Sequence, residues 1–292
     1  MSLTRIRIFD ILNYLLLALF VVICVYPFYY VLIYSISSPA KVAQGIFLLP
    51  AGLDFTTYKS ILQLPYIVNS FFISAARTIV GTMLTILCCS LFSYLISKPE
   101  MALRKLVYRL LVVTLYINAG LIPWYITMKM LHLNNNFLLY VLPSAVSGYY
   151  VILMKTYIEQ IPKALEESAM IDGAGYLTLF WKVIFPLCKP IVATVAIFAA
   201  VGQWNNWMDN YFLVQNQNLK TMQLILYEYL NSANALATMD AASITRNAQN
   251  VVLTPESIKM ATTMLVALPI LLVYPFLQRY FVKGIMLGAV KG

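Results

Sequence analysis

Acidic side chains are the first candidates for chemistry, and their spacing argues against catalysis. Glu166 and Glu167 are adjacent, so a helix would point their carboxylates in different directions instead of pairing them for acid–base work. The single histidine, His132, cannot build a His-rich metal site, and the cysteines show no metal-ligand spacing. The sequence contains no Gly-x4-Gly-Lys-Ser/Thr loop of the kind that binds nucleotide phosphates. We therefore predict that the chain is not an enzyme and holds no metal or cofactor itself.

Arg77 is the costliest residue in the sequence, because it falls near the middle of a long apolar run. An arginine at the centre of a bilayer costs about 2.5–3.5 kcal/mol on insertion scales, so such a residue usually faces a cavity or a partner. Two interpretations are open. Arg77 contacts an anionic or hydroxyl-rich substrate, or it pairs with a carbonyl or an acid on a neighbouring span.

A polar and aromatic segment, residues 203–210, combines the groups that suit sugar binding. Aromatic faces pack against sugar C–H groups, whereas amides and acids bond to hydroxyls. The substrate-path candidates in this segment are Trp204, Asn205, Trp207 and Asp209. The alternative is an aromatic belt at the level of the lipid headgroups. Asn118 is a further candidate, since Gly120 and Pro123 indicate a kinked helix whose freed backbone groups need a bundle interior or a wet cavity.

The composition indicates a membrane protein. The chain is 61% hydrophobic and 11% charged, whereas a soluble domain averages about 25% charged residues. An apolar run of about 20 residues can cross a hydrocarbon core about 30 Å thick. We predict an all-α integral membrane protein, a single transmembrane domain over residues 1–292, with six spans at about 11–34, 66–96, 106–130, 137–158, 191–214 and 260–281. The first run is too long for a cleaved signal peptide and does not end in small residues.

The basic residues predict the orientation of these spans. With both termini in the cytoplasm, thirteen of the 20 Lys and Arg residues lie on the cytoplasmic side and six on the outer side, as the positive-inside rule requires. The loop of residues 159–190 is then cytoplasmic, and the loop of residues 215–259 is external. The external loop is polar but contains Leu226, Tyr227 and Tyr229, so we expect it to be folded.

The cytoplasmic loop has the pattern of a short helix, a tight turn and a second apolar segment. Pro162 suits the first position of a helix, and Gly173 can adopt the positive φ of a turn. The loop resembles the EAA loop of permease subunits in bacterial ATP-binding-cassette (ABC) importers. Glu167, Ala169, Gly173 and Pro186 match that motif at its spacing, with Ser168, Val183 and Phe185 as replacements of similar size. The resemblance implies an ATPase-docking and coupling role for Glu166, Glu167, Ser168, Ala169, Asp172, Gly173, Ala174 and Pro186.

The resemblance covers nearly the whole chain. Residues 116–125 are similar to the third-span signature of an oligosaccharide and polysaccharide sub-branch. This sub-branch belongs to the maltose-permease-like, type 1 carbohydrate-uptake permeases, and residues 282–292 are similar to the tail of that carbohydrate-uptake branch. The resemblance implies a type I importer permease in the bacterial inner membrane. Such a permease would import oligo- or polysaccharide, including uronate-containing polymers of the alginate or pectin type. The implied partners are a homologous permease, two ATPase subunits that hold ATP and Mg, and an extracytoplasmic solute-binding protein, with no nucleic acid. In the maltose branch the external loop reaches into the binding protein, which makes Leu226, Tyr227 and Tyr229 contact candidates.

Two other classes of protein remain as alternatives. A secondary transporter driven by protons or sodium often shows an internal repeat and buried acids near the middle of the membrane. Here the six spans show no obvious duplication, and the intramembrane charge is an arginine. A membrane-embedded glycan-processing enzyme would need a catalytic set of side chains, which the sequence lacks.

Overall fold

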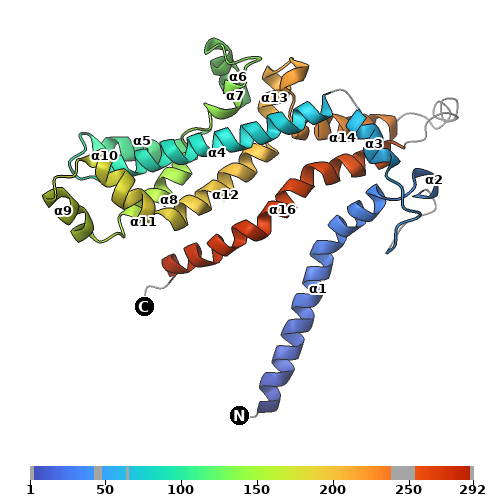
Figure 1. Ribbon diagram of the computed structural model, residues 1–292, viewed down its shortest axis with the longest axis horizontal. Coiled ribbons are helices and arrows are strands. Elements are labelled where there is room, and N and C mark those ends of the chain that lie inside the picture. Colours follow the sequence, from blue (N-terminus) through green and yellow to red (C-terminus); the bar gives the residue numbers. More distant parts are fainter. Residues whose placement is uncertain (1–2, 43–47, 64–65, 238–253, 290–292) are drawn as a thin grey trace. The chain divides into compact units, whose positions relative to one another are not determined.

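The computed structural model describes residues 3–42, 48–63, 66–237 and 254–289, and these residues fold almost entirely into helices (Figure 1). Within these ranges the sole β pairing is an isolated bridge between Ser37 and Leu53. The predicted all-α fold class is therefore confirmed. Residues 238–253, which belong to the predicted external loop, lie outside the described residues. The chain divides into two compact units, residues 1–67 with 226–269 and residues 68–225 with 270–292.

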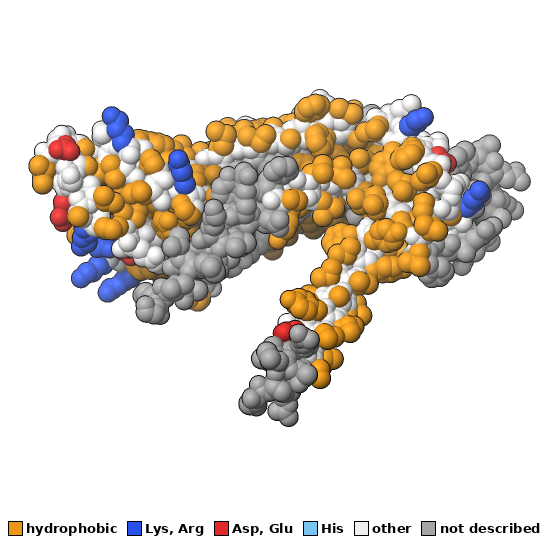
Figure 2. Space-filling view, turned by 60° about the horizontal axis from the view of Figure 1, so that its bottom comes forward, with side chains coloured by type: hydrophobic (Ala, Val, Ile, Leu, Met, Phe, Trp, Pro, Cys, Tyr) orange, Lys and Arg blue, Asp and Glu red, His pale blue; other side chains and the backbone are white. Residues whose placement is uncertain are grey.

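The first unit is built around a long apolar helix, α1. Its helices are α1 (Leu3–Ser35), α2 (Pro39–Val42), α3 (Thr56–Gln63), most of α14 (Met222–Ala237) and the first part of α16 (Pro255–Ala289). The hydrophobic side chains of α1 are largely exposed, and Figure 2 shows them along the visible face of the helix. A helix that is hydrophobic on all sides fits a lipid environment, so α1 has the character of the first predicted span.

The second unit has α4 (Ile67–Ser97) as its longest helix. The other elements of this unit are α5 (Arg104–Tyr116), α6 (Leu121–Met130), α7 (Leu138–Val141), α8 (Gly148–Ile158), α9 (Lys163–Ile171), α10 (Tyr176–Leu179), a π-helical turn (Phe180–Ile184), α11 (Phe185–Leu187), α12 (Lys189–Asn205), α13 (Met208–Leu213) and a 3-10 turn (Gln217–Leu219). Figure 1 shows α5, α8 and α12 running beside α4, with α9 at one end.

The buried face of α4 is a stripe of small and polar residues. It repeats every three or four positions, as one helix face does, and consists of Ser70, Ser74, Arg77, Gly81, Thr85, Cys89 and Ser93, with Ile96 next on the same face. Small side chains let helices approach closely in a membrane, where the hydrophobic effect does not drive association. Cys89 packs with Leu111 of α5, Val151 of α8 and Val195 of α12, so this stripe holds the second unit together.

Three helices among the described residues are long and apolar enough to cross a bilayer alone, at Ile8–Ser35, Ile67–Ser97 and Glu256–Pro275. They correspond to the first, second and sixth predicted spans. A fourth candidate is the pair Tyr176–Leu187 and Lys189–Asn205, bent by 80°, whose second helix lies in the fifth predicted span.

The third, fourth and fifth predicted spans are each divided into two shorter helices. In the fifth, α12 ends at Asn205 and α13 begins at Met208. α5 ends at Tyr116 and α6 begins at Leu121, after Gly120 with φ of 81°. α7 and α8 are separated by a segment that contains Pro143, which lacks a backbone N–H for helical bonding. The kink predicted beside Asn118 is thus a complete break, and the count of six spans stays a prediction.

Candidate functional site

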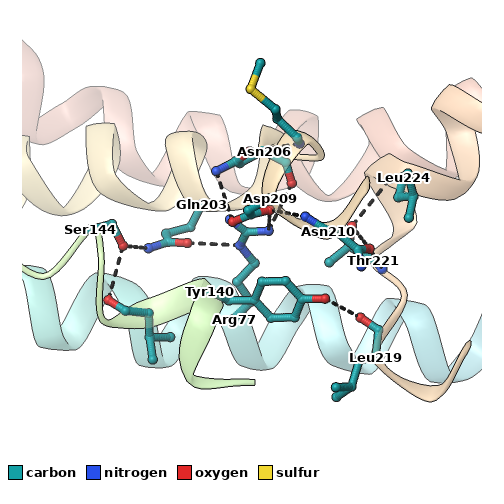
Figure 3. Close-up of polar contacts among 12 residues, drawn as sticks. Arg77, Tyr140, Ser144, Gln203, Asn206, Asp209, Asn210, Leu219, Thr221 and Leu224 are labelled. Atoms are coloured by element: carbon teal, nitrogen blue, oxygen red, sulfur yellow. Dashed lines mark hydrogen bonds and ion pairs between the residues drawn. The ribbon is translucent and has the colours of Figure 1, made fainter. Parts of the chain in front are cut away.

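Arg77, on the buried face of α4, is the centre of a polar network (Figure 3). The residue is 1% exposed. Its guanidinium donates two hydrogen bonds to the Asp209 carboxylate on α13, one of them from Nη1 to Oδ1 at 2.9 Å. The Arg77 Cζ atom lies 4.6 Å from the centre of the Tyr140 ring, a cation–π distance. Arg77 therefore has the acidic partner that one of its two interpretations requires.

Gln203 connects Arg77 to the segment between α7 and α8. Its Oε1 accepts a hydrogen bond from Arg77 Nε at 3.0 Å, and its Nε2 donates to Ser144 Oγ at 2.6 Å. Gly81 provides the space for this amide, because a Cβ atom at Gly81 would lie 2.5 Å from Gln203 Nε2. Helices α4 and α12 are thus in close contact at the level of Arg77, and the Gln203 amide is held in one orientation.

The Asp209 carboxylate has further hydrogen-bond donors besides Arg77. Oδ1 accepts from the backbone N–H of Asn210 at 2.7 Å, and Oδ2 accepts from Asn206 Nδ2 at 3.3 Å. The Asn210 side chain in turn accepts from the backbone N–H of Thr221 at 2.8 Å. Buried charges are tolerated when they are paired and hydrogen-bonded. The Arg77–Asp209 pair meets both conditions and is neutral as a unit.

A pocket of about 510 Å³ opens beside this network. Three predicted substrate-path residues line it, namely Arg77, Asn118 and Asp209. Trp124 and Asn206, which were not among the named candidates, also line it and add an indole ring and an amide, Asn206 from within the predicted segment 203–210. A second pocket of about 360 Å³ adjoins the first and shares Pro143, Ser144 and Asn206 with it. The structure therefore brings aromatic, amide, hydroxyl and charged groups together along one path.

The other three predicted substrate-path residues line neither pocket. Trp204 is 8% exposed and packs edge-on against Phe71, with the ring centres 6.0 Å apart. Trp207 packs against Tyr211 at 5.9 Å, and Asn205 is exposed. The segment 203–210 thus contributes to the site through Gln203, Asn206 and Asp209 rather than through its tryptophans.

The loop predicted to be cytoplasmic, residues 159–190, forms the predicted helix and turn. α9 carries Glu166, Glu167, Ser168 and Ala169, and none of its residues is buried. The helix ends at Ile171 with Asp172 as its C-cap, and Gly173 then adopts a φ of 82°. The N–H of Ala174 donates to the carbonyl of Ala169 at 3.0 Å and closes the turn. The predicted turn at Gly173 is therefore confirmed, whereas Pro162 precedes the helix instead of being its first residue. Pro186 is exposed within α11.

The two adjacent glutamates of α9 have different surroundings. The Glu166 carboxylate forms an ion pair with Lys98, the residue after α4. Glu167 is exposed, and among the described residues its carboxylate has neither a hydrogen bond nor an ion pair. Charged side chains gather at the end of the second unit that carries α9 (Figure 2). Glu167 is thus available to a partner, whereas Glu166 is held within the chain.

The described part of the predicted external loop, residues 215–237 and 254–259, is largely helical. α14 occupies Met222–Ala237. Leu226 is 8% exposed, so in this conformation it is not offered to a partner. Tyr227 and Tyr229 are half-buried, and part of each side chain reaches the surface.

Comparisons with known proteins agree over almost the full length. The family model described as "Binding-protein-dependent transport system inner membrane component" matches residues 6–287. The chain is 33% identical over 287 residues to Protein LplC of Bacillus subtilis (strain 168), covering 98% of this chain and 96% of that protein. It is 32% identical to the polygalacturonan/rhamnogalacturonan transport system permease protein YtcP of the same organism, covering 98% and 99% of the two chains.

A solved structure is also similar to this chain. It belongs to a bacterial ABC transporter involved in the import of the acidic polysaccharide alginate, with a TM-score of 0.85 and 30% sequence identity. The match covers 96% of this chain and 99% of the other.

Proposed function

The chain belongs to the family of inner-membrane components of binding-protein-dependent transport systems, and from this premise we propose that it passes oligo- or polysaccharide along the two adjoining pockets beside Arg77. It is the permease of a sugar ABC importer, a transport subunit rather than an enzyme. Neither an ion-coupled transporter nor a glycan-processing enzyme fits this family.

The lining of the two pockets carries the proposal for the path. Saccharides present hydroxyl groups and C–H faces, and the pockets offer Asn118 and Asn206 amides, the Ser144 hydroxyl and the Trp124 ring. Pockets that bind small molecules in proteins are about 300–1,000 Å³ and combine apolar walls with a few polar groups. The adjoining volumes of about 510 and 360 Å³ suit consecutive sugar units of one chain.

We further propose that the substrate contains uronates, because one relative is named for polygalacturonan and rhamnogalacturonan transport and a similar structure for import of an acidic polysaccharide. Arg77 is already paired with Asp209, so these pockets present a neutral surface. The uronate carboxylates of the substrate would then be recognised by the partner permease or the binding protein, while this chain contacts sugar hydroxyls and ring faces.

Transport of one acidic and one neutral oligosaccharide by an Arg77→Gln complex tests this division. After normalisation to assembled complex, we expect the same loss for both sugars, because Arg77 acts as a structural partner of Asp209. A loss confined to the acidic sugar would contradict this and would make Arg77 a carboxylate contact. Asn118→Ala, which removes an amide from the pocket, should instead lower transport of both sugars without lowering the amount of complex.

The loop around α9 supports a proposal for coupling. Glu167 is exposed and Gly173 has open space around its Cα, since a Cβ there would meet no atom of this chain within 4 Å. We propose that α9 docks on an ATPase subunit and transmits its motion to the permease. ATP and Mg would bind to that subunit, and two such subunits, a homologous permease and an external solute-binding protein would complete the complex in the inner membrane, with both termini of this chain in the cytoplasm.

Gly173→Val tests the docking proposal, with Gly175→Val as the matched control. A β-branched residue is strained at a φ of 82°, whereas Gly175 has φ of −76° and ψ of 165°, which valine adopts easily. Both sites have open space around the missing Cβ. We expect Gly173→Val to lower transport and substrate-stimulated ATP hydrolysis together, while Gly175→Val keeps both. Normal transport in the Gly173→Val complex would remove the loop from the mechanism.

The external loop of residues 215–259 is proposed to contact the binding protein through Tyr227 and Tyr229 of α14. Shortening this loop should weaken the stimulation of ATP hydrolysis by the binding protein and leave basal hydrolysis intact. Unchanged stimulation in the shortened complex would leave the loop with no role in binding-protein contact.

A further inference from the structure

The end of α4 contacts both arms of the loop of residues 159–190. The outgoing arm is α9, and the returning arm runs from α10 to α11. Lys98 follows α4 directly, and its ammonium forms an ion pair with Glu166 on α9, the first arm. The side chains of Lys98 and Glu166 are 11% and 18% exposed, so the pair is largely shielded from water. The same ammonium lies 4.5 Å from the centre of the Tyr94 ring, one turn earlier on α4. A cation held by a carboxylate on one side and a ring face on the other is fixed in place.

Tyr94 extends this contact to the second arm. Its ring centre lies 5.3 Å from that of Phe180, which belongs to the π-helical turn after α10. Phe180 is 1% exposed and also contacts Phe185 of α11, with the ring centres 5.6 Å apart. The outgoing arm is thus bonded to α4 by charge, and the returning arm is packed against α4 by aromatic rings.

α4 is an uninterrupted helix between this end and the pocket. Lys98 lies 21 residues beyond Arg77, which corresponds to about 31 Å at 1.5 Å per residue. Described helical bonding runs from Ile67 to Ser97 without a break. A displacement of the Lys98 end as a rigid body would therefore also move Arg77 and its contacts with the pocket.

We propose that Lys98 and Glu166 are positioning residues that lock α9 to α4, so that a partner moving α9 also moves α4 and the Arg77 pocket. The proposal rests on the proposed docking of α9 to an ATPase. The two neighbouring glutamates then have separate tasks: Glu167 faces the partner, and Glu166 connects the docked helix to the transmembrane part of its own chain.

The test measures saccharide transported per ATP hydrolysed in the full complex, normalised to assembled complex. Glu166→Gln removes the charge but keeps the shape and leaves Lys98 over Tyr94. We expect it to lower this ratio by roughly fivefold or more, the usual lower range of coupling between sites. Lys98→Gln should do the same, Lys98→Arg should keep the ratio, and the exchanged pair Lys98→Glu with Glu166→Lys should recover most of it.

Glu159→Gln is the matched control, because Glu159 forms ion pairs with Arg104 and Lys155 at the same end of the unit, and no ion pair among the described residues joins it to α9. It should leave the transported-per-hydrolysed ratio unchanged. A wild-type ratio in Glu166→Gln overturns the proposal, and so does a lower amount of complex with an unchanged ratio, since the pair would then be structural only. If the single variants do not assemble, failure of the exchanged pair to restore assembly and ratio also overturns it. Failure of the proposed function looks different, because the wild-type complex would then show no substrate-stimulated ATP hydrolysis.

Discussion

Helix α4 carries an ion pair in its interior and another at its end, and the two pairs differ in what surrounds them. Arg77–Asp209 is enclosed, with side chains 2% and 6% exposed, and both partners bond to amides and backbone groups as well. Lys98–Glu166 lies near the surface, with an exposed neighbour, Glu167. The Arg77–Asp209 pair leaves no charged group without a partner. The Lys98–Glu166 pair, in contrast, lies beside Glu167, whose exposed carboxylate has no ion pair among the described residues.

The difference follows from the cost of burying charge. Inside a membrane protein an uncompensated charge is expensive, so the Arg77–Asp209 pair requires further hydrogen bonds to be stable. At the end of α4 that carries Lys98, Glu167 is exposed and water can solvate its carboxylate, so Glu167 needs no partner within the chain. The interior of α4 is therefore suited to fix a structure, and its end is suited to receive a partner.

The largest effect is expected from leaving Arg77 without its acid. Asp209→Asn keeps the size of the side chain but leaves a buried guanidinium without a counter-charge. Breaking a buried pair from one side costs about 3–5 kcal/mol, so we expect a large fall in the thermal stability and amount of the complex. The double variant Arg77→Gln with Asp209→Asn removes both charges and should recover most of that loss. Equal stability of the single and double variants would show that the charges are not coupled and would end the contrast between the two pairs.

A second prediction concerns the close approach of α4 and α12. Gly81→Ala would place a Cβ atom 2.5 Å from Gln203 Nε2, so the amide must move away from Arg77 and Ser144. Overpacking of this kind costs about 1–3 kcal/mol, and the loss should appear as lower thermal stability of the complex.

Gly202→Ala is the matched control for this substitution. It adds a methyl group to α12 one residue before Gln203, where a Cβ meets no atom within 4 Å. Replacing a helical glycine in open space should leave stability unchanged or raise it by about 0.4–1 kcal/mol. Equal destabilisation by both substitutions would show that the Gly81 contact with Gln203 is not the cause.

The sequence predicts the elements of this molecule better than their contacts. Apolar runs predicted α1, α4 and α16, because length and hydropathy are local properties. The sequence offered two roles for Arg77 but could not name Asp209 as its partner, since the two lie 132 residues apart and only the packing of α4 against α13 joins them. The stripe of small residues on α4 was present in the sequence at helical spacing, and it would have indicated the buried face.

The loop around α9 shows the same division. The turn at Gly173 was predictable, because a positive φ favours glycine and the motif spacing marks the position. The separation of Glu166 from Glu167 was not, because it depends on where the end of α4 brings Lys98. The break between α5 and α6 was predicted only as a kink, since the residue type at Gly120 permits a positive φ but does not require one.

A third prediction concerns ion pairs that are more exposed than the two pairs of α4. Arg104–Glu159 and Lys155–Glu159 are ion pairs whose Glu159 side chain is 37% exposed. Exposed pairs contribute about 0–1 kcal/mol and are screened by salt. We expect Glu159→Gln to change the thermal stability of the complex only slightly, with the difference vanishing at high salt. A loss as large as that of Asp209→Asn would show that exposure does not distinguish the pairs.

The smallest effect is expected at Asp54, a partly exposed acid whose side-chain hydrogen bonds are local. Its carboxylate accepts hydrogen bonds from the hydroxyl and from the backbone N–H of Thr56, the latter at 2.8 Å, at the start of α3. These bonds hold the pKa of Asp54 below its usual range. A lowered pKa stabilises the folded helix end above the unfolded pKa, and the contribution is lost as the pH falls through the lowered value. Hydrogen exchange of α3 amides should therefore rise in acid, and in Asp54→Asn it should already be slightly raised at neutral pH and no longer depend on acid. If the variant keeps the acid dependence of the wild type, another group controls this helix end.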